Sequence, residues 1–291
     1  MTKTPKSIAL GGAIRQARQA HGETLRDFAG RMGVDPAMMS RWETGARSPQ
    51  PENVARMLTA LGVTGERYKG LMTLAYGTGQ DQWVATSLPE QQQQMFAFVS
   101  CEQQATRLVE FSPLLIPGLL QTTDYTRAIM SAPGVPPAEI EDRVRLRADR
   151  KEVILRPHPA HLTAIIGEGA LYQGIGGAAV TEGQLRYLLA IGRRANVELR
   201  IVPNGTGWHP GLEGPFHLIE GVNLITSVFV ETRRSTLWLH KEADVRAYKQ
   251  AVELILRHAL SPGDSMRFVA HQVRRMETRR DLPDHVAQGH P

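Results

Sequence analysis

The stretch GVDPAMMSRWETG, residues 33–45, connects two short amphipathic patterns and decides how the start of the chain folds. Before it, Thr24 is suited to cap a helix. The apolar residues of that helix recur at i, i+3, i+4 and i+7 as Leu25, Phe28, Ala29 and Met32. Gly33 stands where this helix needs a left-handed residue, and Asp35 and Pro36 predict the N-cap and first residue of the next helix. The order of these signals predicts a helix-turn-helix.

The second of these predicted helices has two chemically different sides. Met39 and Trp42 are three residues apart and share a face, which we expect to pack on the preceding helix. The other side carries Ala37, Ser40, Arg41 and Thr44. The pattern therefore predicts a helix that is packed along one stripe and open to a partner along the other. An ordinary helical hairpin in a small bundle is the alternative interpretation.

Positive charge is concentrated in the first quarter of the chain. Further helices are expected over residues 8–20, 51–61 and 65–76, which makes residues 1–76 an all-α domain of five helices. This domain holds eleven basic and six acidic side chains, whereas the remaining 215 residues hold 23 of each. The asymmetry is typical of a basic module that faces a polyanion, although an arginine-rich solvated surface would give the same count.

Length and composition exclude several classes of protein. The 291 residues allow two domains, and no run of about 18 apolar residues predicts a membrane span. Residues 1–10 lack the apolar stretch of a signal peptide, so we expect a cytoplasmic protein. The single cysteine, Cys101, forms no internal disulfide and no thiolate metal site, and we expect it to be a small buried hydrophobic residue.

Residues 23–49, ETLRDFAGRMGVDPAMMSRWETGARSP, resemble the helix-turn-helix of the Cro/C1-type regulators of the xenobiotic-response-element family, which have a lambda-repressor-like fold. The matching positions are Thr24, Ala29, Gly33, Val34, Ser40, Arg41, Glu43 and Gly45. The resemblance implies an ion pair between Arg18 and Glu43 that joins the first and third helices. Leu25 and Pro36 depart from the family, which commonly places glutamine at both positions.

The same residues suggest how this domain would bind DNA. The guanidinium of Arg41 can reach guanine O6 and N7, with Ser40 assisting, and the neighbouring apolar residues can contact thymine methyl groups. Arg26, Arg47 and backbone N–H groups near Thr24 can hold phosphates. Few polar side chains remain to contact base edges, so we expect DNA shape to contribute to sequence recognition. The complete set of candidate DNA-binding residues is Arg41, Ser40, Ala37, Met38, Thr44, Arg47, Arg26, Thr24 and Leu25.

The rest of the chain divides into a linker, a larger domain and a tail. Residues 77–94 are polar and weakly periodic, which predicts a linker in which Trp83 docks on one of the domains. Residues 95–277 alternate helical and strand patterns and predict an α/β domain. The expected elements are helices over 122–130, 136–155, 181–194, 241–260 and 262–277, and strands over 161–171, 196–203, 215–221, 227–232 and 236–240. Residues 278–291 have too little apolar content to fold and predict a disordered tail.

The larger domain also carries a resemblance. The stretches PLLIPGLLQTTDYTRAIM at 113–130 and RRANVELRIVPNGTGWHPGLEGPFHLIE at 193–220 resemble the domain of unknown function that follows a helix-turn-helix in many actinobacterial regulators. That domain is often described as antitoxin-like. The resemblance implies that the protein regulates transcription. It does not indicate which ligand the domain binds.

Two groups of residues in this domain are candidates for a binding site. A pocket for a small ligand or a partner protein is expected to include Tyr125, Trp208, His209 and Glu213. A tight structural turn is the alternative for the loop GWHPGLEGPFH. The neighbouring Leu114, Leu115 and Ile116 are expected in the core.

An enzymatic function is not expected. His158 and His161 flank Pro159, so they share no helical face, and no third ligand follows at metal-site spacing. Neither a Gly-x-Ser-x-Gly nor a Walker sequence is present. We therefore expect no catalytic residue, no metal and no cofactor.

The sequence predicts a DNA-binding transcriptional regulator, a homodimer on a palindromic operator. Its α/β domain would sense a small-molecule effector or a small protein encoded nearby. The alternative is an antitoxin-like interaction module that neutralises such a neighbouring product, with DNA binding secondary. A hydrolase-like activity in residues 95–276 would need an ordered acid–base pair that the sequence does not display.

Overall fold

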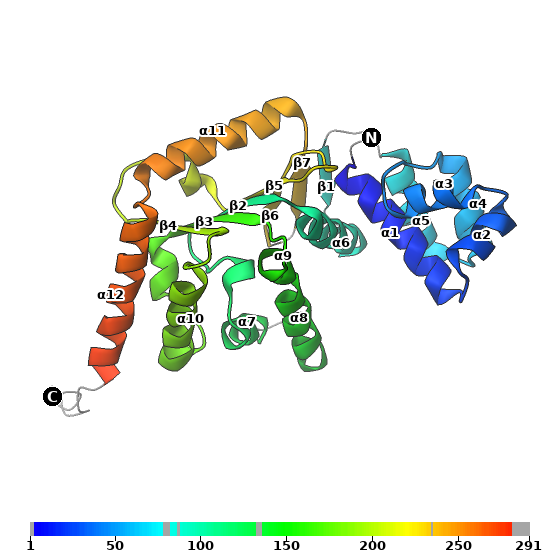
Figure 1. Ribbon diagram of the computed structural model, residues 1–291. Coiled ribbons are helices and arrows are strands. Elements are labelled where there is room, and N and C mark those ends of the chain that lie inside the picture. The colour runs from blue at the N-terminus through cyan, green and yellow to red at the C-terminus, as the bar shows by residue number, and fades with distance from the viewer. Residues whose placement is uncertain (1–2, 78–81, 86–87, 132–135, 234, 281–291) are drawn as a thin grey trace. The chain divides into compact units, whose positions relative to one another are not determined.

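The structure is a computed structural model that describes residues 3–77, 82–85, 88–131, 136–233 and 235–280 (Figure 1). It confirms the predicted fold class, an all-α N-terminal region followed by a larger α/β region. Two compact units are present, Met1–Leu108 with Phe216–Tyr248, and Val109–Pro215 with Lys249–Pro291. The division therefore does not follow the predicted domain boundaries. No helix among the described residues is long and apolar enough to cross a membrane.

Five helices form the N-terminal module (Figure 1): α1 Pro5–Ala20, α2 Leu25–Met32, α3 Pro36–Glu43, α4 Pro51–Ala60 and α5 Gly65–Tyr76. The local signals act as predicted. Thr24 accepts a hydrogen bond from the backbone of Asp27, and Gly33 ends α2 with φ +66°. Asp35 caps α3 by accepting from the N–H groups of Ala37 and Met38 at 2.8 and 3.2 Å. The helix boundaries are thus set by short-range chemistry.

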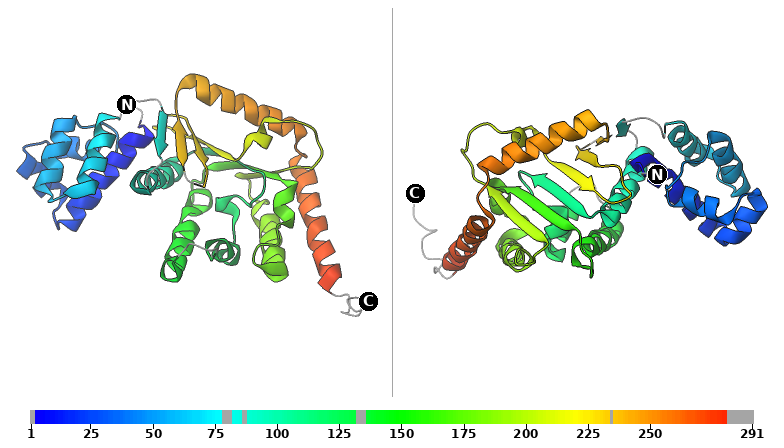
Figure 2. Two further views of the ribbon diagram at one scale, coloured as in Figure 1. Left: turned by 180° about the vertical axis from the view of Figure 1, so that it is seen from behind. Right: turned by 45° about the horizontal axis from the view of Figure 1, so that its top comes forward.

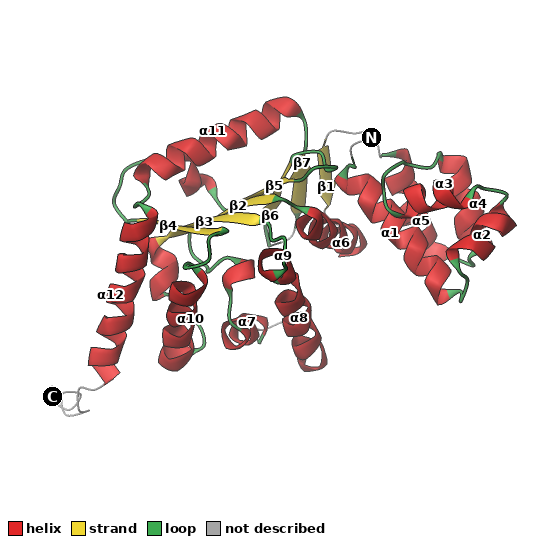
Figure 3. Ribbon diagram, viewed as in Figure 1, coloured by secondary structure: helices red, strands yellow, loops and turns green. Residues whose placement is uncertain are grey.

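The seven strands form one mixed sheet in the order β1-β7-β6-β5-β2-β3-β4, drawn in yellow in Figure 3. Their bounds are β1 Gln82–Ala85, β2 Arg107–Ser112, β3 His161–Gly167, β4 Val197–Val202, β5 Phe216–Glu220, β6 Ser227–Glu231 and β7 Thr236–Leu239. β3 and β4 are parallel, whereas β5, β6, β7 and β1 pair antiparallel in turn. The strand predicted over residues 161–171 ends at Gly167, where a short 3-10 helix begins.

The first compact unit adds strands β1, β5, β6 and β7 and helix α6, Leu88–Gln104, to the helical module. Phe98 of α6 lies against the rings of Phe229 and Trp238, with centroids 4.6 and 6.4 Å apart. Trp83 is buried and pairs in register with Trp238, which confirms that it docks. The predicted linker therefore contains a strand and the start of a helix, because Trp83 completes an aromatic core.

The second unit has strands β3 and β4 with helices on them (Figure 2). These helices are α7 Thr123–Met130, α8 Pro137–Arg150, α9 Glu152–Leu155, α10 Gly177–Ile191 and α12 Pro262–Arg280; helix α11, Glu242–His258, has residues in both units. The single helix predicted over 136–155 is divided into α8 and α9 at Lys151. The predicted disordered tail is helical to Arg280, and residues 281–291 lie outside the described residues.

A buried polar network holds the loop between β2 and α7. Glu110 accepts a hydrogen bond from the Gly118 N–H at 3.2 Å, and Gln184 donates to the Leu120 carbonyl at 2.7 Å. Burial raises the pKa of Glu110 to about 6, while the Arg150 guanidinium limits the rise. The folded unit therefore binds a proton at Glu110 more tightly than the unfolded chain does.

This difference predicts how stability depends on pH. Because the folded-state pKa of Glu110 lies above its ordinary value of 4.5, its contribution to stability is full below pH 4.5 and is lost as the pH rises through 6. Relative to Glu110→Gln, the unchanged protein should gain about 2 kcal/mol of unfolding free energy between pH 7 and pH 4.5. Urea unfolding followed by circular dichroism measures this; a constant difference between the two proteins would contradict it.

Candidate nucleic-acid interface

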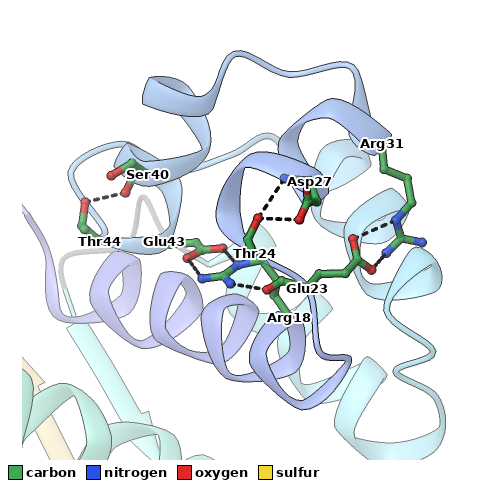
Figure 4. Close-up of polar contacts among 8 residues, drawn as sticks. All are labelled: Arg18, Glu23, Thr24, Asp27, Arg31, Ser40, Glu43 and Thr44. Carbon is green, nitrogen blue, oxygen red and sulfur yellow. Dashed lines mark hydrogen bonds and ion pairs between the residues drawn. The ribbon is translucent and has the colours of Figure 1, made fainter.

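A buried ion pair joins α1 to the end of α3 (Figure 4). Arg18 Nε and Nη2 donate to Glu43 Oε1 and Oε2 at 2.7 and 2.8 Å, and Nη1 donates to the Glu23 carbonyl at 2.7 Å. Both side chains are buried. The hydrogen bond to Glu43 raises the pKa of Arg18 above its ordinary value. The pair implied by the family resemblance is therefore present and fixes how α3 lies on α1.

The two sides of α3 separate as the sequence predicted. Met39 and Trp42 are buried, as are Phe28 and Ala29 of α2, which packs against α3. Arg41 is exposed. The other members of this surface are exposed or half-buried: Ala37, Met38, Ser40, Thr44 and Arg47. The Thr44 hydroxyl donates to the Ser40 carbonyl at 2.8 Å, so it also closes the last turn of the helix (Figure 4).

The start of α2 already holds a carboxylate (Figure 4). The Thr24 hydroxyl accepts from the Asp27 N–H at 3.2 Å and donates to Asp27 Oδ2 at 2.6 Å. A carboxylate in the first turn stabilises the positive end of the helix. Arg26 is exposed and Leu25 is half-buried. Of the residues predicted here, Arg26 is the one that offers a cation to a phosphate.

Sequence reasoning missed two residues that seat the recognition helix. A Cβ on Gly11 of α1 would lie 2.2 Å from the Trp42 carbonyl oxygen, so only glycine allows α1 and α3 to approach this closely. The Ser7 hydroxyl donates to the Gly45 carbonyl at 2.9 Å and holds the turn after α3. The signal was the Gly-Gly pair at 11–12 inside a helical pattern, because an internal glycine marks close packing.

The four residues of the second predicted site differ in exposure. Tyr125 is only 2% exposed, and its hydroxyl accepts from the Ile116 N–H at 3.4 Å. Trp208 is 68% exposed and Glu213 is exposed, whereas His209 is buried with its ring 5.4 Å from that of His258. Tyr125 and His209 are therefore part of the interior, whereas Trp208 and Glu213 lie at the surface.

The core assignment of the neighbouring loop was wrong in part. Ile116 is buried as predicted, but Leu114 is 58% exposed and Leu115 is 43% exposed. The reason is that Pro113 turns the chain beside Gly167, where an added Cβ would lie 2.4 Å from the Pro113 carbonyl oxygen. The two leucines are carried onto the surface by this contact.

Among the described residues, no group of three or more His, Cys, Asp or Glu side chains is placed to hold a metal ion. Cys101 is buried, as expected, and burial raises the pKa of its thiol to about 12.

A helix-turn-helix of this kind supports a DNA-binding regulator. Residues 9–68 match a sequence model of a helix-turn-helix domain, and residues 96–271 match the model described as "Domain of unknown function (DUF5753)". The chain belongs to this DUF5753 family. No curated protein and no solved structure matches the chain.

Because the ion pair is buried, we expect a single substitution in it to lower the free energy of unfolding more than the double substitution does. Arg18→Met leaves the Glu43 carboxylate buried without its cation and should cost about 3 kcal/mol of unfolding free energy. The double variant with Glu43→Leu removes both charges and should recover most of that loss. Urea unfolding of the full chain gives both values, and Arg15→Met, at an exposed position of α1, is the matched control. Equal losses in the single and double variants would show that the pair does not join the helices.

Proposed function

We propose that the chain is a sequence-specific transcriptional regulator of the xenobiotic-response-element type that inserts α3 into the major groove of DNA. One observation carries the proposal: Arg41 stands exposed on α3 while Met39 and Trp42 anchor the opposite side in the core. A recognition helix needs this separation, since its outer residues must reach base edges while its inner face stays fixed.

Base recognition is assigned to Arg41, with Ser40 and the apolar Ala37 and Met38 beside it. We assign phosphate binding to the side chains of Arg26 and Arg47. We do not assign it to the backbone N–H groups at the start of α2, because Asp27 places a negative charge there. The concentration of net charge in residues 1–76 supports this division.

We further propose that the regulator is a cytoplasmic, non-enzymatic homodimer. One recognition helix reads only a few base pairs, and two copies on a palindromic operator supply the remaining specificity. The α/β region then provides the contact between copies and responds to an effector, which changes DNA affinity through linkage.

A second candidate function rests on the surface of the second unit. Leu114, Leu115 and Trp208 are large apolar side chains exposed to solvent. A protein partner that covers them would remove this apolar surface from water. This supports the antitoxin-like alternative, in which a small protein encoded nearby binds the α/β region. A tight complex with such a protein, and no DNA retained at low salt, would favour this alternative.

The first experiment on DNA tests whether Arg41 of α3 contacts the bases of the operator. The operator is obtained by sequencing the genomic fragments that the purified protein retains. Arg41→Ala should weaken operator binding by about 1–3 kcal/mol and relax the preference at one base pair. Fluorescence anisotropy on the operator and its single-base variants measures both effects. Arg193→Ala, an exposed arginine of the second unit, is the matched control. Unchanged operator affinity in Arg41→Ala would contradict the assigned recognition face.

Arg26 should behave differently from Arg41. Arg26→Ala removes a phosphate contact, so it should weaken operator and unrelated DNA alike and reduce the slope of log affinity against log salt by about 1. Titrations of both duplexes at several salt concentrations give this slope. A selective loss on the operator alone would instead make Arg26 a base-reading residue.

A further inference from the structure

Helix α1 contacts the recognition helix and α6 through two consecutive glycines. Gly11 lies against the backbone of α3, as described above. Gly12 lies under the ring of Phe96 in α6, where an added Cβ would be 2.0 Å from Phe96 Cε1. The Gly11 contact meets backbone atoms and has no room for a side chain, whereas Gly12 meets the end of the Phe96 side chain. A displacement of α1 would therefore also move the support of α3.

A cavity lies beside this contact, between α1, α5 and α6, all in the first compact unit. Its volume is about 570 Å³, within the range of roughly 300–1,000 Å³ usual for small-molecule sites. Ala9 and Ala13 of α1 and Gly70 of α5 face it. The cavity exists because these three helices meet through small residues.

The walls of the cavity combine apolar surface with polar groups. Phe96 and Leu71 supply an aromatic ring and an aliphatic side chain. Gln16, Gln92 and Gln93 also line the cavity, and within the described part of the chain none of their amides has a hydrogen-bond partner. These amides are thus available to a ligand.

Charge on the cavity wall favours an anion. Glu66 and Arg67 both line it, and Glu66 accepts a hydrogen bond from Lys69 at 2.8 Å. Glu66 already has a cationic partner in Lys69, whereas the Arg67 guanidinium makes no ion pair within the described part of the chain. A guanidinium binds a carboxylate through two parallel hydrogen bonds.

We propose that this cavity binds a planar aromatic carboxylate and that its occupation changes the affinity of α3 for DNA. The ring stacks on Phe96, the carboxylate meets Arg67, and the glutamine amides bind the remaining polar edge. The ligand contacts α1 directly, and α1 supports α3 through Gly11. This inference rests on the proposed function for its effect on DNA, but not for the binding itself.

Binding is tested first, without DNA, on the full chain. The probe is 2-naphthoate, and its uncharged counterpart is 2-naphthamide. Isothermal titration calorimetry measures the binding of both. Arg67→Gln should weaken 2-naphthoate about tenfold and leave 2-naphthamide unchanged. Ala13→Phe fills the cavity and should abolish binding of both probes. Ala138→Phe, at an exposed position of α8, is the control and should bind both normally.

A second variant with a filled cavity distinguishes loss of the binding site from loss of folding. Gly70→Leu projects a side chain into the same cavity and replaces a glycine inside α5, which favours the helix. Its melting temperature should match or exceed that of the unchanged protein, and it should bind neither probe. Failure of 2-naphthoate to bind the unchanged protein, or equal binding to Gly70→Leu, overturns the site.

The effect on DNA is measured separately. Saturating 2-naphthoate should shift operator affinity at least fivefold in the unchanged protein and leave Gly70→Leu unaffected. Probe binding with no shift in operator affinity overturns the coupling through α1. Probe binding by a protein that retains no DNA overturns the proposed function and leaves the binding site standing.

Discussion

The buried pair of Arg18 and Glu43 is the interaction on which the N-terminal module depends. Two long, flexible side chains are taken out of water, and the cost is offset because the carboxylate receives two hydrogen bonds and the guanidinium also reaches a backbone carbonyl. The geometry is bidentate and therefore directional. Together with the close approach at Gly11 and the Ser7 hydrogen bond to Gly45, it sets the position of α3 on α1.

Helix α1 has a wider role than bracing the recognition helix. Gly11 brings it against the backbone of α3, Gly12 brings it against Phe96 of α6, and the Lys6 ammonium donates to the carbonyls of Gly77 and Gln82. The helix-turn-helix match ends at residue 68 and the DUF5753 match begins at 96, and residues 96–108 and 216–248 of the second match lie in the same compact unit as the first match.

Sequence reasoning failed where local and distant signals compete. The segment around Trp83 is polar and lacks periodicity, so it reads as a linker, but the strand forms because Trp83 pairs with Trp238, far away in the sequence. Leu114 and Leu115 read as core because they are apolar, but the turn at Pro113 exposes them. Hydrophobicity gives the tendency of a side chain to be buried; the path of the backbone decides whether it can be.

The sequence by itself determined the helix-turn-helix, because caps, glycine stops and the spacing of Met39 and Trp42 act over a few residues. It also determined the exposed stripe of Arg41 and the uneven charge. Only the tertiary structure decided that α1 joins the recognition helix to α6, and that small residues on three helices leave a cavity there. These features depend on backbone approach between distant segments: the Gly11-Gly12 pair marks close packing in the sequence, but no local pattern says which helices pack there.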